Sequence, residues 1–237
     1  IADRAMERFG RIDVWVNNVG GSARGGPIDM DEAVWDSQID HNLKSVFLTC
    51  KHVLPHMLKR GSGHIVQMSS VAGAIPFPGL AAYSGSKAGL TNFTESLRLE
   101  LADTPIHFTV VAPGPVDTPM WDRLDTGDSY QAPALKRFRQ LQFLPKIKPE
   151  KIAAATVEAV QKKKRFVRLP ARFGMYHMLN NAPRRLVEIA MTGVKLPLST
   201  AASAASTELA TADDWAPIWA TDNPPSKKWP LYTRGNV

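Results

Sequence analysis

The sequence predicts an α/β domain in which helices cover a parallel sheet. Segments of strand length alternate with longer segments of helical apolar periodicity through about residue 170. This alternation implies parallel strands joined by right-handed crossovers. The chain has 237 residues, of which 44 % are hydrophobic and 22 % charged. That length can bury a substantial core, and the composition excludes a wholly disordered or collagen-like chain.

Each predicted element ends at a recognisable signal. Gly10 closes a first helix, Gly61 and Gly63 follow the third, and Pro105 stops the fourth. Pro113 and the glycine after it end the third strand. The expected helices are residues 1–9, 31–39, 42–60, 81–102 and 149–163, and the expected strands are 12–17, 64–69, 106–112 and 165–169. No stretch reaches the ~18 consecutive apolar residues of a membrane span.

The last forty residues differ from the rest. An Ala/Ser/Thr tract at 199–212 precedes a segment rich in Pro and Trp at 215–237, and neither has a helical or strand period. We expect 199–237 to be a poorly ordered tail. The alternative is that its tryptophans dock on a partner or on the body of the protein.

The net charge of +7 is concentrated in the second half of the chain. The densest run is Lys162-Lys163-Lys164-Arg165, which is typical of a solvated helix end, where cations suit the helix dipole. Contact with a membrane surface or an anionic substrate is the second interpretation. Nucleic-acid binding is disfavoured because no recognised module accompanies the charge. The single cysteine, Cys50, requires no oxidising compartment, which fits a cytoplasmic protein.

One constellation can carry acid/base chemistry. The sequence lacks the common zinc, P-loop and G-x-S-x-G motifs, and no metal site is expected. Tyr83 and Lys87 are four residues apart at the start of a long predicted helix, so they share one face. A nearby ammonium favours the phenolate, which makes the pair a candidate general acid/base. Alone, this spacing is more often an ordinary helix start.

The predicted strand ends supply the context. Ser70 closes the second strand, Asn17 to Gly20 close the first, and residues 113–118 (P-G-P-V-D-T) close the third. Open α/β sheets bind their ligands at these carboxyl ends. Asn42 lies within a helical pattern, where an amide is usually exposed but can instead interrupt the helix and contribute to a site.

The motifs N-N-V-G, H-N-L, S-S-V-A-G, Y-S-G-S-K and P-G-P-V-D-T together resemble the classical short-chain dehydrogenases/reductases over roughly residues 1–170. The resemblance implies a Rossmann-type fold and hydride transfer between NAD or NADP and an alcohol or carbonyl. Tyr83 would exchange the hydroxyl proton, and Ser70 would hydrogen-bond the reacting oxygen. Lys87 would bind the nicotinamide ribose and lower the Tyr83 pKa, and Asn42 would hold a water that links Lys87 to solvent. Ser69 competes with Ser70, but its spacing from Tyr83 fits less well.

The resemblance also implies a cofactor site. Pro113 and Gly114 would pass beneath the nicotinamide, while the Val116 backbone and the Thr118 hydroxyl would orient its carboxamide. Asn17 to Gly20 would pack on the adenosine side and support the central strands. The implied cofactor-binding set is Asn17, Gly20, Asn42, Tyr83, Lys87, Pro113, Gly114, Val116 and Thr118.

Two departures from the family pattern stand out. Val19 replaces the usual alanine, and the family's initial glycine-rich turn is absent. We therefore expect residues 1–198 to be the C-terminal portion of such a domain, with roughly 60–75 residues missing before Ile1. Strand 12–17 would then be an edge with uncovered Ile12, Val14 and Val16. The chain alone is expected to aggregate, to bind cofactor poorly and to be inactive.

The sequence indicates less about the substrate than about the cofactor. Met120, Trp121 and Leu124, together with an apolar segment at about 171–198, fall where the family covers its substrate. They favour a bulky apolar alcohol or ketone, although core or subunit contacts explain them equally well. The resemblance implies a homo-oligomer, a dimer or tetramer, for the full-length protein. The alternative function is a non-catalytic interaction protein, or an inactive fragment that has lost its cofactor-binding half.

Overall fold

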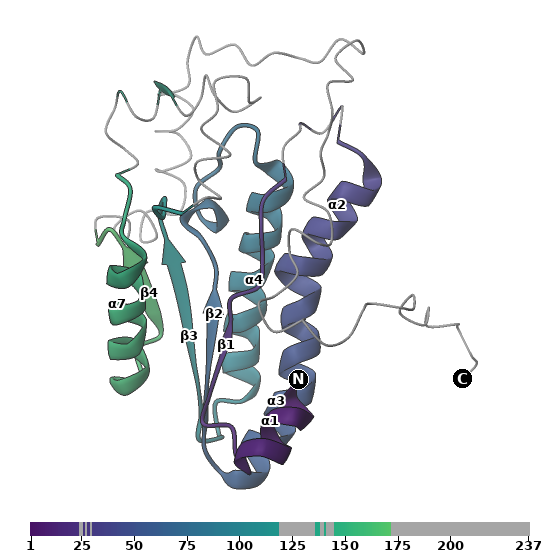
Figure 1. Cartoon of the computed structure of the whole chain (residues 1–237), viewed down its shortest axis with the longest axis vertical. Coiled ribbons are helices and arrows are strands. Elements are labelled where there is room, and N and C mark those ends of the chain that lie inside the picture. The colour runs from purple at the N-terminus through teal and green to yellow at the C-terminus, as the bar shows by residue number, and fades with distance from the viewer. Residues whose placement is uncertain are drawn as a thin grey trace, which may run out of the picture. The chain divides into compact units, whose positions relative to one another are not determined.

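Four parallel strands form the sheet of the computed structural model, which describes residues 1–23, 26, 28, 30–118, 136–137, 140 and 145–171 (Figure 1). The strands are β1 (Val14–Asn17), β2 (Gly63–Met68), β3 (Ile106–Pro113) and β4 (Phe166–Leu169), and they lie in this order across the sheet. Every neighbouring pair is parallel. The predicted α/β class with a parallel sheet is therefore confirmed.

The helices fall between the strands as the periodicity predicts. They are α1 (Ala2–Phe9), α2 (Glu32–Ile39), α3 (Ser45–Arg60), α4 (Ala81–Glu100) and α7 (Pro149–Gln161). Gly10 and Gly61 end α1 and α3 with φ of 70° and 72°, the left-handed conformation that glycine adopts without strain. The described residues also include a π-helical turn, η1 (Asp40–Lys44), between α2 and α3, and a 3₁₀ turn, η2 (Val71–Gly73), after β2.

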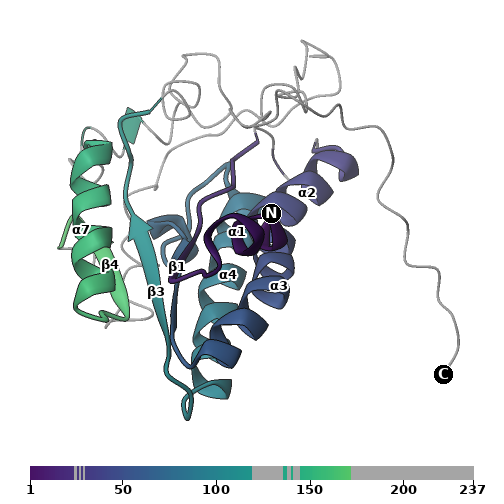
Figure 2. The same ribbon diagram turned by 60° about the horizontal axis from the view of Figure 1, so that its bottom comes forward.

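The strands bury side chains on both faces of the sheet, as their two-residue period requires. Ile65 of β2 points into a core shared with α1, α3 and α4, whereas the next residue, Val66, points into a core beneath α7. Figure 2 shows α7 on one side of the strands and α3 and α4 on the other. Because helices cover both faces, the carboxyl ends of the strands are where a site can form.

β1 lies at the edge of the sheet, as predicted. Val14 and Val16 are 43 % and 51 % exposed, while Trp15 between them packs into the core with α3. Ile12 departs from the expectation: it is 7 % exposed, lies before the strand begins and packs into the same core as Ala2. The turn out of α1 carries Ile12 inward, so the exposed apolar side chains of β1 itself are Val14 and Val16.

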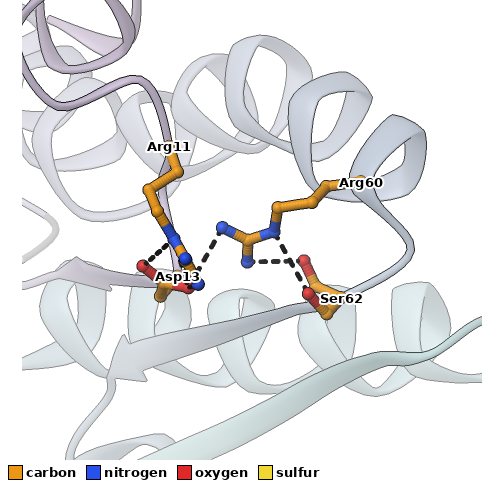
Figure 3. A network of polar contacts seen from close by, with 4 residues as sticks. All are labelled: Arg11, Asp13, Arg60 and Ser62. Atoms are coloured by element: carbon orange, nitrogen blue, oxygen red, sulfur yellow. Dashed lines mark hydrogen bonds and ion pairs between the residues drawn. The ribbon is translucent and has the colours of Figure 1, made fainter.

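A polar network fixes the start of β1 to the end of α3 (Figure 3). Arg11 binds the Asp13 carboxylate, and Arg60 Nη1 lies 3.0 Å from the same group. The Arg60 guanidinium also donates to the Ser62 hydroxyl and carbonyl, at 3.1 and 2.8 Å. The network ties together two connections at the amino end of the sheet, away from the strand ends that carry the site.

Three of the four cations in the basic run after α7 pair with carboxylates. Lys162 and Lys164 each lie within 3.0 Å of Glu158, at 2.9 and 2.8 Å, and Arg165 pairs with Glu95. This arrangement favours the solvated helix end over an anion-binding surface. Over the described ranges, no helix is both long and apolar enough to cross a membrane.

Several predictions fall on residues outside the described ranges. They concern the apolar segment from residue 172 to 198, the tail at 199–237, and Met120, Trp121 and Leu124. The substrate-covering role of the apolar segment and the poor order expected for the tail therefore stay predictions.

The buried His64 makes stability depend on pH. Its Nε2 lies 2.7 Å from Thr109 Oγ1, whose hydroxyl donates to the Lys164 carbonyl, so His64 Nε2 carries a proton and donates to Thr109. Burial lowers the His64 pKa to about 4, helped by His107 and Lys163. The unfolded chain therefore binds one more proton than the folded chain between pH 6.5 and pH 4.

We predict that this contribution is fully present above pH 6.5 and is lost as the pH falls towards 4, at a cost of about 2–3 kcal/mol. Urea unfolding at a series of pH values measures it. The variant His64→Gln should show a flatter dependence, whereas replacement of the exposed His52 by Gln should not. Equal pH dependence in all three proteins would contradict the assignment.

Candidate active site

The start of α4 places the predicted acid/base pair beside the end of β2. Tyr83 and Lys87 are one helical turn apart, and Lys87 Nζ lies 5.9 Å from the centroid of the Tyr83 ring. Lys87 is only 4 % exposed. The Ser70 side chain lies near enough to Tyr83 to oppose the rise in the Tyr83 pKa. The three side chains that the motifs single out therefore meet at one place.

Ser70 is held by the turn that follows β2. Its Oγ accepts a hydrogen bond from the N–H of Ala72 at 3.1 Å and so caps η2. Close packing at Gly73 brings this turn against α4, since a Cβ at Gly73 would lie 2.8 Å from the carbonyl of Lys87. Only glycine permits that approach, which keeps Ser70 within reach of Tyr83.

Burial governs the protonation of the pair. Lys87 Nζ donates to the Met68 carbonyl at 2.8 Å, and burial lowers the Lys87 pKa to about 8. Burial raises the pKa of Tyr83, and the hydrogen bond from Ser70 opposes this rise. Burial has the larger effect, so the pKa of Tyr83 is raised on balance.

Asn42 lies in the π-helical turn and is fully buried. Its Oδ1 accepts from the N–H of Gly21 at 2.9 Å, and its Nδ2 donates to the Gly21 carbonyl at 2.9 Å and to Ser86 Oγ at 3.0 Å. Ser86 in turn donates to the Tyr83 carbonyl at 2.7 Å. The amide does interrupt the helix, and it links the segment after β1 to α4. Turns of this kind are frequent at functional sites.

Gly20 completes this layer. A Cβ there would lie 2.5 Å from Asn42 Oδ1 and 3.1 Å from Lys87 Nζ. The backbone of Gly20 is therefore pressed against both groups. The predicted residues Gly20, Asn42 and Lys87 are brought together.

The two competing serines have different surroundings. Ser69 is 5 % exposed, and its hydroxyl donates to the Lys87 carbonyl at 3.1 Å. It also lies 2.8 Å from Thr91 Oγ1. Ser70, not Ser69, contacts Tyr83. The geometry favours Ser70 as the residue at the reacting oxygen.

Asn17 is directed into the sheet. Its Nδ2 donates to Gln67 Oε1 at 2.9 Å, while its Oδ1 accepts from Trp15 Nε1 at 2.9 Å and Thr49 Oγ1 at 2.7 Å. Its amide is occupied by protein groups, so it supports the strands. The side chain is not offered to a cofactor, because residues alternate sides along a strand and Asn17 faces the core.

The segment after β3 is fixed by its neighbours. Gly114 N–H donates to the Leu169 carbonyl at 2.7 Å. Val116 pairs with Ile147 through bonds made by Pro115 and Asp117, so the Val116 N–H takes no part in them. Thr118 Oγ1 is 3.4 Å from the Val116 carbonyl. Pro113, Gly114, Val116 and Thr118 lie at the carboxyl end of β3, next to the end of β2.

Sequence reasoning missed two supporting residues, Gly73 and Ser86. Both lie inside the motifs S-S-V-A-G and Y-S-G-S-K, but the motifs alone give no reason to separate a packing glycine from a turn glycine. Among the described residues, no group of three or more His, Cys, Asp or Glu side chains is placed to hold a metal ion.

The family follows from comparison with known proteins. The model described as short chain dehydrogenase matches residues 1–129, more than half of the chain. The chain belongs to the short-chain dehydrogenase family, and its α/β fold is of the Rossmann type.

Among curated relatives, the chain is 38 % identical over 153 residues to the 3-oxoacyl-[acyl-carrier-protein] reductase of Thermotoga maritima. That match covers 65 % of this chain and 60 % of the relative. This chain is also 42 % identical over 125 residues to the 2-(R)-hydroxypropyl-CoM dehydrogenase of Xanthobacter autotrophicus, and that match covers 51 % of this chain and 50 % of that enzyme. The matches thus span about half to three-fifths of these relatives' length.

Two solved structures also match this chain. A short-chain dehydrogenase from Streptomyces avermitilis aligns with a TM-score of 0.63 at 28 % identity, covering 81 % of this chain and 71 % of that one. An actinorhodin polyketide ketoreductase solved with NADPH aligns with a TM-score of 0.65 at 29 % identity, covering 73 % and 71 %. These neighbours and the family support NAD or NADP as the cofactor.

We predict that Gly20→Ala destabilises the fold by about 1–3 kcal/mol, because its methyl group overlaps Asn42 Oδ1 and crowds Lys87 Nζ. Gly85→Ala is the matched control: it lies on α4, where a Cβ meets nothing within 4 Å. The control should stabilise by roughly 0.5–1 kcal/mol, since alanine favours helix. Urea unfolding measures both. A Gly20→Ala protein as stable as the control would contradict the packing argument.

Proposed function

We propose that the chain is an NAD(P)-dependent oxidoreductase that transfers hydride between a nicotinamide and an alcohol or ketone, with Tyr83 as general acid/base. The observation that carries the proposal is the position of the buried Lys87, whose Nζ lies 5.9 Å from the centroid of the Tyr83 ring, with Ser70 near enough to Tyr83 to affect its pKa. Packing alone does not require a phenol, a hydroxyl and an ammonium to meet at the carboxyl end of a parallel sheet.

Lys87 fits a cofactor. An ammonium has three donors, and within the described ranges Lys87 Nζ makes one hydrogen bond, to the Met68 carbonyl. Since Lys87 is 4 % exposed, the remaining donors call for a polar partner, and ribose hydroxyls meet this need. The Val116 N–H, left out of the bridge to Ile147, is available for a carboxamide. The nicotinamide, when bound, supplies the hydride acceptor or donor.

In the direction of alcohol oxidation, Tyr83 Oη would take the hydroxyl proton as hydride leaves the same carbon. Ser70 Oγ would donate to the developing carbonyl oxygen and hold it beside Tyr83. Lys87, when protonated, would favour the phenolate by its charge. In the reverse direction Tyr83 would return the proton to the carbonyl oxygen. Asn42 would fix the loop of Gly21 against this site.

The substrate proposed is an apolar ketone or secondary alcohol. The relatives named above include a 3-oxoacyl reductase, a polyketide ketoreductase and a dehydrogenase of a hydroxypropyl group. The apolar segment at residues 171–198 adds to this proposal from the sequence. We also propose that the protein assembles into a homo-oligomer and is cytoplasmic.

We predict that Tyr83→Phe lowers kcat by about 10²–10⁴, because the ring is kept and the transferable proton is lost. Cofactor affinity should change little. The measurement follows nicotinamide absorbance with NAD and NADP against a panel of small and bulky secondary alcohols and ketones, with calorimetry for cofactor binding. Tyr232→Phe controls for loss of a tyrosine elsewhere.

Near-normal turnover in Tyr83→Phe would overturn the acid/base assignment. If the unsubstituted chain binds a dinucleotide but turns over no substrate in the panel, the catalytic proposal fails, and a non-catalytic interaction role replaces it.

A further inference from the structure

Three consecutive residues at the end of β2 bond to α4. The Met68 carbonyl accepts from Lys87 Nζ at 2.8 Å. Ser69 Oγ donates to the Lys87 carbonyl at 3.1 Å. Ser70 lies near enough to Tyr83 to oppose the rise in the Tyr83 pKa. Lys87 is thus held at both its side chain and its backbone by the two residues that precede Ser70.

We propose that Ser69 is a positioning residue for the reaction: its hydroxyl fixes the end of β2 on the Lys87 carbonyl and so keeps Ser70 Oγ on the Tyr83 hydroxyl. This inference rests on the proposed function of Tyr83. Ser69 is 5 % exposed and its N–H donates to the Val111 carbonyl at 2.8 Å, so its own place is set by β3. It therefore transmits the register of the sheet to the helix that carries Tyr83.

Thr91 belongs to the same cluster but has a different part in it. Thr91 Oγ1 lies 3.0 Å from the Lys87 carbonyl and 2.8 Å from Ser69 Oγ. Three contacts join Ser69 Oγ, Thr91 Oγ1 and the Lys87 carbonyl, yet two hydroxyls supply only two protons. One hydroxyl therefore donates to the other, and the second donates to the carbonyl.

This proton count predicts different effects for the loss of the Thr91 hydroxyl and the loss of the Ser69 hydroxyl. Without the Thr91 hydroxyl, Ser69 can still donate directly to the Lys87 carbonyl, and the link between β2 and α4 survives. Without the Ser69 hydroxyl, Thr91 satisfies the carbonyl of its own helix, and the bond from Ser69 to α4 is lost, which leaves the bond from Lys87 Nζ to the Met68 carbonyl. Ser69 is therefore the residue whose removal loosens the end of β2 beside Ser70.

The test reads the ionisation of Tyr83 directly. The full chain is prepared with Tyr130, Tyr176 and Tyr232 replaced by Phe and with the remaining Tyr83 labelled as 3-fluorotyrosine, which ionises at a lower pH than tyrosine. The ¹⁹F shift is followed against pH. Because Ser70 lowers the Tyr83 pKa, Ser69→Ala should move the midpoint upward by about 0.5–1 pH unit, the effect of weakening one hydrogen bond.

Ser70→Ala, measured in the same way, gives the upward shift of the Tyr83 midpoint that follows when the effect of Ser70 is removed completely. Ser69→Thr keeps a hydroxyl and should restore the original midpoint, and Thr91→Val should leave it unchanged. Thr94→Val is the matched control: within the described part of the chain, this buried hydroxyl donates to the Leu90 carbonyl of its own helix, at 2.7 Å. Should Ser69→Ala fail to fold, Ser69→Cys fills the same space with a weak donor and should show the upward shift.

A Ser69→Ala or Ser69→Cys midpoint equal to that of the unsubstituted protein overturns the proposal, as does an equal shift in Thr94→Val. The readout needs no turnover. A failed shift with intact dependence of turnover on Tyr83 rejects the role of Ser69 alone, whereas loss of that dependence rejects the proposed function.

Discussion

The burial of the Lys87 ammonium is the constraint on which the rest of the site depends. A cation at 4 % exposure is unfavourable unless polar groups surround it. The Met68 carbonyl meets part of that need at 2.8 Å, and the Gly20 backbone closes over the same atom. The helix that presents Lys87 must therefore pack at a fixed distance from the ends of β1 and β2, and Tyr83, one turn earlier, is fixed with it.

Small residues make this packing possible. Gly73 brings the turn after β2 against the Lys87 backbone, and Gly20 brings the segment after β1 against Lys87 Nζ. Asn42 is fully buried, and its side-chain amide binds both the N–H and the carbonyl of Gly21. The π-helical turn that aims its amide is a local irregularity that the rest of the α2–α3 helix tolerates. Backbone packing and one buried amide thus assemble a site whose reactive groups come from a single helix and one strand end.

The sequence predicts the groups proposed to react better than the groups that hold them in place. The four-residue spacing of Tyr83 and Lys87 and the strand-end place of Ser70 follow from helix and sheet geometry, so these could be predicted. The direction of the Asn17 side chain and the buried Ile12 depend on how the chain turns between elements. The choice of Met68 as the partner of Lys87, and the rise in the Tyr83 pKa, depend on burial, which no spacing rule contains.

The most direct test of this account is the pKa of Lys87 in the folded chain. Lysine labelled at the ε-carbon with ¹³C, compared between the unsubstituted protein and Lys87→Gln, isolates its signal in an NMR titration. The account predicts a resonance, absent from the variant, that titrates near pH 8, because burial lowers the Lys87 pKa to about 8. A Lys87 signal that titrates with the exposed lysines near pH 10.4 would contradict it, because the ammonium would then be solvated and would hold neither Met68 nor Tyr83 in place.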